Sequence, residues 1–283
     1  MKKKIIVVAA HPDDEVLGCA GTIAKHVDQG DKVHLVFMTD GESARPNSSE
    51  AKLKRRLKAS KSVKALLGIS STHYFNFPDN SMDSVPLLDI VKKLEAIIFK
   101  IKPSVIYTHS HCDLNIDHQL THAAVMTACR PTPKTSIREI YGFEVLSSTE
   151  WSATRKFKFE PSLFVDITKY QEIKIKALKV YKDEMRSAPH SRSIKHAKVL
   201  AQHRGYTVGF EMAEAGRMLE PVTPMSRAAT VYARLSALSD RYGLGRKLAI
   251  LLTIVALAAA FATYAAITGS SPLGADTRTV LIL

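Results

Sequence analysis

Five consecutive residues near the N-terminus could form a metal site. The sequence HPDDE at residues 11–15 holds one imidazole and three carboxylates. His11 and Asp14 offer a nitrogen and an oxygen ligand of the kinds that zinc binds, and Asp13 supplies a second carboxylate that could face a bound water. The same carboxylates could instead cap a following helix and interact with its dipole. Both interpretations require a turn at this point of the chain.

A second polar cluster lies within residues 107–124. It contains four histidines and two aspartates: His109, His111, Asp113, Asp117, His118 and His122. A lone histidine is usually packed or solvated, whereas this density of ligand side chains indicates a site. His118 and His122 are four residues apart and could share one helix face, but residue 119 is Gln, so the HExxH motif with its glutamate base is absent.

Both clusters directly follow apolar runs, at 4–10 and 104–109, that are typical of strands buried on both faces of a parallel sheet. Alternating strands and helices predict a Rossmann-like, mainly parallel α/β sheet with helices on both faces. In such sheets ligands collect beyond the carboxyl ends of the strands, where both clusters stand. Further strands are expected at 32–39, 72–75, 139–145 and 163–167, and helices at 16–30, 50–67, 86–101, 168–186 and 194–203, with another starting near His118.

The AHPDDE loop at 10–15 and the DLNIDH segment at 113–118 together resemble the motifs of the PIG-L/LmbE family of zinc-dependent N-deacetylases. The likeness covers most of residues 1–220. It implies hydrolysis of an N-acetyl amide, which gives acetate and a free amine.

The resemblance also implies a role for each matching residue. His11, Asp14 and His118 are then the Zn²⁺ ligands. Asp13 is the general base that takes a proton from the attacking water, and Asp117 orients a ligand histidine. Three protein ligands leave a coordination position for water and the amide oxygen.

One position departs from the family pattern. Many members have HPDH where this chain has Asn115 to His118, and the first histidine of HPDH polarises the carbonyl or protonates the leaving group. Asn115 can donate a hydrogen bond but cannot supply a proton. Either zinc and Asn115 suffice for the oxyanion, or His111 or His109 reaches the site from the preceding loop.

Two further segments resemble family regions near the substrate. Asp40 lies in a Thr-Asp-Gly-Glu turn after the 32–39 strand, so it is a candidate substrate-binding residue or part of an ordinary β-to-α turn. Arg204, upstream of the EMAE sequence at 211–214, could meet an anionic group of the substrate or form a surface ion pair.

The chain has 283 residues and a formal net charge of +13. This charge suits nucleic acid, an anionic membrane surface or an anionic substrate. Its basic runs, such as 52–58, lack interleaved aromatic residues and match no nucleic-acid module, so we expect solvated helix faces and no nucleic-acid partner. Three cysteines without a CxxC pair indicate a reducing compartment.

The C-terminal part differs in character. Residues 248–267 carry no charge and are numerous enough to cross a bilayer as a transmembrane helix, the alternative being a buried C-terminal helix. We therefore expect a catalytic domain at 1–221, a linker and basic juxtamembrane segment at 222–247, the membrane helix, and a short tail at 268–283.

The charges around the membrane helix predict its orientation. Arg241, Arg246 and Lys247 precede it, whereas Asp276 and Arg278 are the only charged residues after it. The positive-inside bias places the catalytic domain in the cytoplasm, tethered to the membrane.

Together these observations predict a zinc-dependent deacetylase of an N-acetylglucosamine-type sugar. Membrane tethering and positive charge favour a lipid-linked or phosphate-bearing substrate. The alternatives are hydrolysis of another N-acyl amide, or a catalytically silent, membrane-anchored glycan-binding protein whose sequence support is Asn115.

Overall fold

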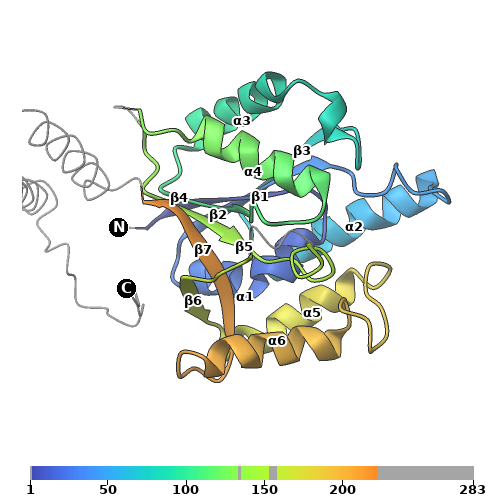
Figure 1. The fold of residues 1–283 in the computed structure, drawn as a ribbon, viewed down its shortest axis with the longest axis vertical. Coiled ribbons are helices and arrows are strands. Elements are labelled where there is room, and N and C mark those ends of the chain that lie inside the picture. The colour runs from blue at the N-terminus through green and yellow to red at the C-terminus, as the bar shows by residue number, and fades with distance from the viewer. Residues whose placement is uncertain (1, 133–134, 153–157, 222–283) are drawn as a thin grey trace, which may run out of the picture. The chain divides into compact units, whose positions relative to one another are not determined.

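Seven strands form a sheet in the computed structural model, which describes residues 2–132, 135–152 and 158–221 (Figure 1). Parallel pairing joins β3, β2, β1, β4 and β5 in that order, and β6 runs antiparallel to β7. The predicted Rossmann-like, mainly parallel sheet is confirmed. Its strands are β1 (Lys4–Ala9), β2 (Lys32–Thr39), β3 (Ser71–Phe77), β4 (Val105–His109), β5 (Glu139–Phe143), β6 (Leu163–Asp166) and β7 (Ala213–Pro221).

Helices cover both faces of the sheet, as predicted (Figure 1). One face carries α3 (Leu87–Ile101) and α4 (Ile116–Ala128). The other carries α1 (Asp14–Asp28), α2 (Glu50–Leu66), α5 (Gln171–Val180) and α6 (Ile194–Tyr206), with α5 packed on α1 and α2. Two 3₁₀ turns, η1 (Met82–Ser84) and η2 (Thr168–Tyr170), complete the described elements.

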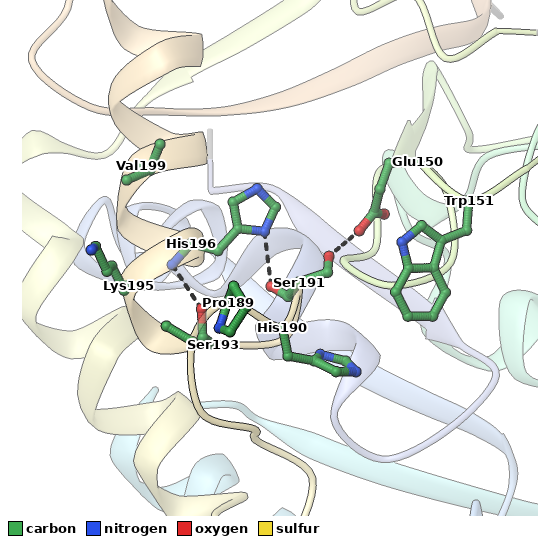
Figure 2. A pocket seen from close by; sticks show the side chains of 10 residues that line it. Glu150, Trp151, Pro189, His190, Ser191, Ser193, Lys195, His196 and Val199 are labelled. Carbon is green, nitrogen blue, oxygen red and sulfur yellow. Dashed lines mark hydrogen bonds between the residues drawn. The ribbon is translucent and has the colours of Figure 1, made fainter.

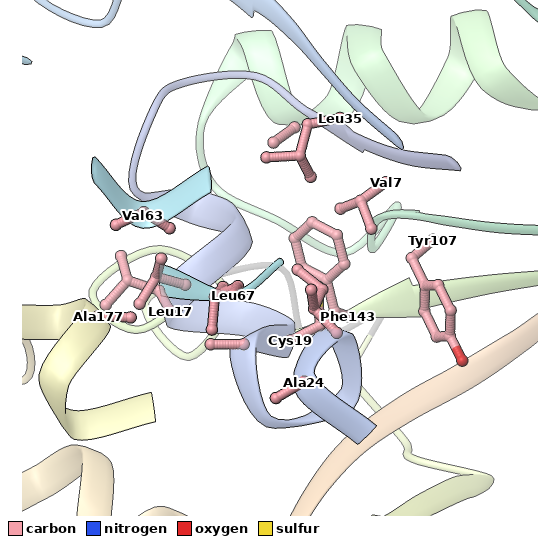
Figure 3. Packing of buried hydrophobic residues seen from close by; sticks show 14 of the residues in the cluster. Val7, Leu17, Cys19, Ala24, Leu35, Val63, Leu67, Tyr107, Phe143 and Ala177 are labelled. Atoms are coloured by element: carbon pink, nitrogen blue, oxygen red, sulfur yellow. The ribbon is translucent and has the colours of Figure 1, made fainter. Parts of the chain in front are cut away.

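The core under α1 shows why these segments adopt their positions (Figure 3). Val7 of β1 and Leu35 of β2 are fully buried against Leu17 of α1 and Val63 of α2. Successive strand residues point to opposite faces, so a continuous apolar run such as that of β1 buries side chains under both helix layers. Burial on both faces fixes β1 in the centre of the sheet.

Two predictions about the second half of the chain were incomplete. The helix expected at 168–186 is a 3₁₀ turn followed by a helix that ends at Val180, beyond which buried Tyr181 leaves helical geometry to reach Glu15. The strand β7 was not predicted at all, because its sequence AEAGRMLEP alternates too weakly. Pairing with β6, Leu163 opposite Gly216, stabilises it instead.

The predicted linker at 222–247, membrane helix at 248–267 and tail at 268–283 lie outside the described residues. Within the described part of the chain, the helices are too short or too polar to cross a membrane.

Candidate metal centre

Three polar atoms from two distant segments converge beyond the carboxyl ends of β1 and β4. His11 Nδ1 lies 3.1 Å from Asp14 Oδ2 and 3.2 Å from His118 Nε2. The third side of the triangle, from His118 Nε2 to Asp14 Oδ2, is also 3.2 Å. All three residues are buried. The structure thus brings together the residues that the family resemblance implies to be metal ligands.

The sheet topology explains this convergence. Adjacent β1 and β4 pair in parallel, so their carboxyl ends meet at the point where the strand order reverses, which is where α/β sheets bind ligands. Asp13 directly precedes α1 with φ of 142°, a conformation that L residues rarely adopt. Its N–H donates to Glu15 Oε2 at 2.9 Å, which holds this turn.

Each candidate ligand histidine contacts a carboxylate through its other ring nitrogen. His11 Nε2 lies 3.2 Å from Asp117 Oδ2, and His118 Nδ1 lies 3.0 Å from Asp113 Oδ1. Asp117 accepts from the backbone N–H groups of Asn80 and Met82, at 2.7 and 3.1 Å. A carboxylate on the remote nitrogen fixes the tautomer and orientation of a metal-binding imidazole.

Asp113 is itself held by the loop after β5. The hydroxyl of Ser148 donates to Asp113 Oδ1, and that of Thr149 donates to Oδ2 at 2.7 Å. Burial opposes ionisation of Asp113, but the neighbouring His118 outweighs it and holds the pKa of this carboxyl at about 2. Asp113 is therefore an ionised partner for His118.

The electrostatics of the triad fit a bound cation. Burial acts to lower the pKa of His118, but the carboxylates of Asp14 and Asp113 outweigh it and raise the pKa to about 10. A proton there occupies the nitrogen that faces His11 and Asp14, and a metal ion replaces such protons when it binds. Asp14 Oδ1 is buried without a hydrogen-bond partner, and an unpaired buried carboxylate oxygen is costly unless a cation neutralises it.

The distances fit a metal as well. Ligands bound at about 2.0–2.2 Å to one tetrahedral zinc ion lie about 3.3–3.6 Å from each other, close to the triangle seen here. Two other groupings, one with His109, Asp113 and His118 and one with His11, Asp79 and Asp117, also bring three ligand atoms together. Asp113 already accepts three hydrogen bonds and Asp117 accepts two from backbone N–H groups, which favours the triad with Asp14.

Both oxygens of the Asp13 carboxylate are paired with arginines. Its Oδ1 accepts from Arg56 Nη2 at 3.0 Å and its Oδ2 from Arg192 Nη1 at 2.9 Å. Burial raises the pKa of Asp13 above its usual range, and both guanidinium groups act against that rise. Arg56 is buried and also donates to the carbonyls of Pro12 and Gly41. Arg192 keeps about a fifth of its side chain exposed.

The three candidates for polarising the carbonyl occupy different surroundings. His109 Nε2 accepts from the Ala10 N–H at 2.8 Å, its ring stacks on that of His118 at 3.9 Å between centroids, and burial lowers its pKa, so it is neutral. His111 contacts Cys112 Sγ at 3.2 Å. Asn115 caps α4: its Oδ1 accepts from the Asp117 N–H at 2.8 Å, which is a structural role.

The structure gives Asp40 and Arg204 structural partners. Asp40 Oδ1 accepts from the N–H groups of Glu42 and Ser43, both at 2.8 Å, which is the hydrogen bonding of an ordinary turn. Arg204 donates twice to Glu144, at 2.9 and 2.7 Å. These contacts match the structural alternatives weighed for the two residues.

A buried ion pair lies at a break in α1, just beyond the metal loop (residues 11–15). The helix breaks at Cys19, where φ is −147°, so its backbone groups need other partners. Glu214 of β7 accepts from the N–H groups of Gly21 and Thr22 at 2.9 and 2.7 Å. Lys174 of α5 donates to Leu17 O at 3.1 Å and to Glu214 at 2.6 Å. The pair thus connects α5 and β7 to the helix that begins at Asp14.

Comparisons with known proteins agree with this geometry. The family model described as GlcNAc-PI de-N-acetylase, PIG-L, matches residues 6–129, which contain every candidate ligand. The uncharacterized deacetylase YaiS of Escherichia coli is 32% identical over 187 residues, which are 64% of this chain and 91% of that protein. The chain belongs to the PIG-L family. It is accordingly a deacetylase by family, with a His-Asp-His group able to hold a metal ion.

Two further proteins similar to this chain have names that give different activities. The structure of the N,N'-diacetylchitobiose deacetylase of Pyrococcus horikoshii superposes with a TM-score of 0.64 at 23% identity, covering 78% of this chain and 84% of the other. The 4-oxalmesaconate hydratase of Pseudomonas putida is 28% identical over 189 residues, 62% of this chain and 72% of that protein. Relatives of this chain therefore include a hydratase beside the deacetylases.

Three residues at the site were not assigned by sequence reasoning. Asp113 was noted in its cluster without a role. Arg56 lies within a basic run interpreted as a solvated helix face, although it is buried on Asp13. Arg192 lies in a polar loop that carries no motif. Two adjacent arginines among the lysines of α2, Arg55 and Arg56, were the one available signal, since a buried ion pair favours arginine over lysine.

Proposed function

We propose that this PIG-L family chain hydrolyses the acetamide of an N-acetylated amino sugar and that the metal it uses is zinc. The observation that carries the proposal is the buried triangle of ligand atoms from His11, Asp14 and His118. The carboxylate of Asp13 belongs to the residue directly before Asp14. Deacetylases of N-acetylated sugars among the relatives support the substrate class.

His11 Nδ1, Asp14 Oδ2 and His118 Nε2 are the atoms that would hold zinc. When bound, zinc polarises the acetyl carbonyl and makes a coordinated water more acidic. Asp117 and Asp113 keep the two imidazoles oriented through their remote nitrogens.

Asp13 then serves as the general base. Burial raises its pKa, which strengthens its affinity for a proton, and each of its oxygens keeps a further lone pair beside the arginine contact. Asp13 accepts a proton from the attacking water and returns it to the departing nitrogen. Arg56 and Arg192 hold the carboxylate in place through this cycle.

The test is acetate release. Purified protein, stripped of metal with a chelator and then supplied with zinc, is incubated with N-acetylglucosamine, N,N'-diacetylchitobiose, a nucleotide-linked and a lipid-linked N-acetylglucosamine. Mass spectrometry detects the loss of an acetyl group. We expect loss from at least one of them, abolished by chelation and restored by zinc. Activity on other N-acyl amides alone would overturn the sugar assignment, and tight sugar binding without turnover would indicate a glycan-binding protein.

We also propose that 248–267 anchors the catalytic domain to the cytoplasmic face of a membrane. The uncharged stretch and its basic leading edge support this. A membrane surface suits a lipid-linked substrate, and the net charge of +13 suits a phosphate-bearing one.

A further inference from the structure

A cavity of about 550 Å³ lies between the loop after β5 and the segment that leads into α6. Figure 2 shows Glu150 and Trp151 on one side, and Lys195, His196 and Val199 on the other. Trp151 is 50% exposed and stands edge-on to the His190 ring at 5.7 Å. A tryptophan left this exposed beside a cavity is a feature of binding sites rather than of cores.

Hydrogen bonds fasten the two walls of the cavity to each other. Glu150 accepts from the Ser191 hydroxyl and from the Ser147 N–H, and Arg192 Nε donates to Ser147 Oγ at 2.6 Å. Within the wall that leads into α6, His196 Nδ1 lies 2.9 Å from the Ser191 carbonyl oxygen (Figure 2). Since both walls are fixed before a ligand arrives, binding requires little ordering of side chains.

The same two segments also reach the candidate metal centre. On one wall, Ser148 and Thr149 donate to Asp113, which contacts His118. On the other, Arg192 donates to Asp13. Residues adjacent in the chain to both walls of the cavity therefore contact Asp113 and Asp13 of the candidate metal centre.

We propose that this cavity is a second part of the substrate-binding site. It binds a pyranose ring that is attached to the reacting amino sugar. This inference rests on the proposed function and extends it. A pyranose has an apolar C–H face that can lie on the indole of Trp151 and a rim of hydroxyls that need hydrogen bonds. The volume falls within the range of small-molecule sites, about 300–1,000 Å³.

The polar groups of the cavity suit those hydroxyls. His190 Nδ1 accepts from the Arg192 N–H at 3.0 Å, so in the neutral ring the proton is on Nε2, which can donate. Lys195 adds an ammonium donor at the far wall. Ring stacking with a few placed donors is the recognition that this lining allows.

Trp151 is the single tryptophan of the chain, so its fluorescence reports on this cavity alone. The first experiment titrates the full chain with chitobiose, which carries no acetyl group and cannot be deacetylated, and with the monosaccharide glucosamine. We expect saturable quenching or a blue shift with the disaccharide at concentrations where the monosaccharide has no effect. Absence of any change with chitobiose would overturn the inference, whether or not the protein is a deacetylase.

The second experiment compares Trp151→Ala, Trp151→Phe and a control, Phe99→Ala, which removes another exposed aromatic ring on α3. For N,N'-diacetylchitobiose we expect Trp151→Ala to raise KM about tenfold with little change in kcat. Trp151→Phe should keep KM close to the wild-type value, and the control should match the wild type. KM for N-acetylglucosamine should not change.

The outcomes separate the two proposals. An equal rise of KM for mono- and disaccharide, or no rise at all in an active enzyme, contradicts the second site and leaves the deacetylase assignment intact. Quenching by chitobiose in a protein that deacetylates nothing contradicts the deacetylase and keeps the cavity. A tryptophan spectrum that shifts to the red when residues 222–283 are removed, and not with sugar, would mean that the chain itself fills the cavity, which overturns the inference.

Discussion

Replacing Glu214 by Gln tests how the fold supports the metal loop. The carboxylate sits in the break of α1, where it accepts four hydrogen bonds, from Gly21, twice from Thr22, and from Lys174. Glutamine keeps the shape but replaces one acceptor oxygen by an NH₂ group. At least one backbone N–H of α1 then loses its acceptor, and the buried ammonium of Lys174 loses its counter-charge.

The size of the effect follows from burial. Glu214 and Lys174 are each only 6% exposed, and breaking a buried ion pair by removing one partner costs about 3–5 kcal/mol. For a domain of this size each kcal/mol lowers Tm by about 2–4 °C, so we expect a decrease of about 6–20 °C. A double variant, Lys174→Met with Glu214→Met, should not recover, because the N–H groups of Gly21 and Thr22 still lack acceptors.

Thermal unfolding followed by circular dichroism measures the decrease in Tm. The matched control is Glu50→Gln, which breaks the exposed pair of Glu50 and Lys54 and should cost less than about 1 kcal/mol. Equal Tm values for Glu214→Gln and Glu50→Gln would refute the reasoning. Full recovery of Tm in the double methionine variant would show that Glu214 acts only as the counter-charge of Lys174 and not as an acceptor for the backbone of α1.

Three further predictions concern the ligand environment, pH and the membrane. Asp113→Asn should weaken metal binding about 10–100-fold in chelator competition, and unchanged affinity would contradict its positioning of His118. Burial lowers the pKa of His26, so its protonation favours the unfolded chain and stability should fall as pH drops below about 6.5. Urea unfolding of His26→Gln should show a smaller fall, and an equal one excludes this cause. The full chain should stay with membranes in alkaline carbonate while a chain ending at Pro221 stays in solution; release of the full chain would exclude a span.

Much of the site was predictable because local pattern and topology coincide. The apolar runs of β1 and β4 are buried on both faces, so they had to be central strands, and their carboxyl ends had to bring the HPDDE loop near the histidine cluster. The i, i+3 spacing of His11 and Asp14 placed two candidate ligands in one turn. Secondary structure and chemistry therefore pointed to the same place.

Long-range contacts were not predictable in the same way. Arg56 lies in the same basic run as solvated lysines, and only the packing of α2 against the Pro12 turn shows that it reaches Asp13. Arg192 contacts Asp13 across 179 positions of the chain. The strand β7 depends on pairing with β6. The contacts of its Glu214 depend on a break in α1 that no local sequence pattern at Cys19 predicts.

The most direct test of the metal centre compares Asp13→Asn with Asp14→Asn, by zinc content and turnover on the same preparations. The two neighbours have identical side chains but different partners, arginines for Asp13 and histidines for Asp14. We expect Asp14→Asn to lose zinc and activity together. Asp13→Asn should keep zinc near the wild-type level and lose turnover about 10²–10⁴-fold, with KM little changed. Loss of zinc in Asp13→Asn, or near-normal turnover in it, would contradict the assignment.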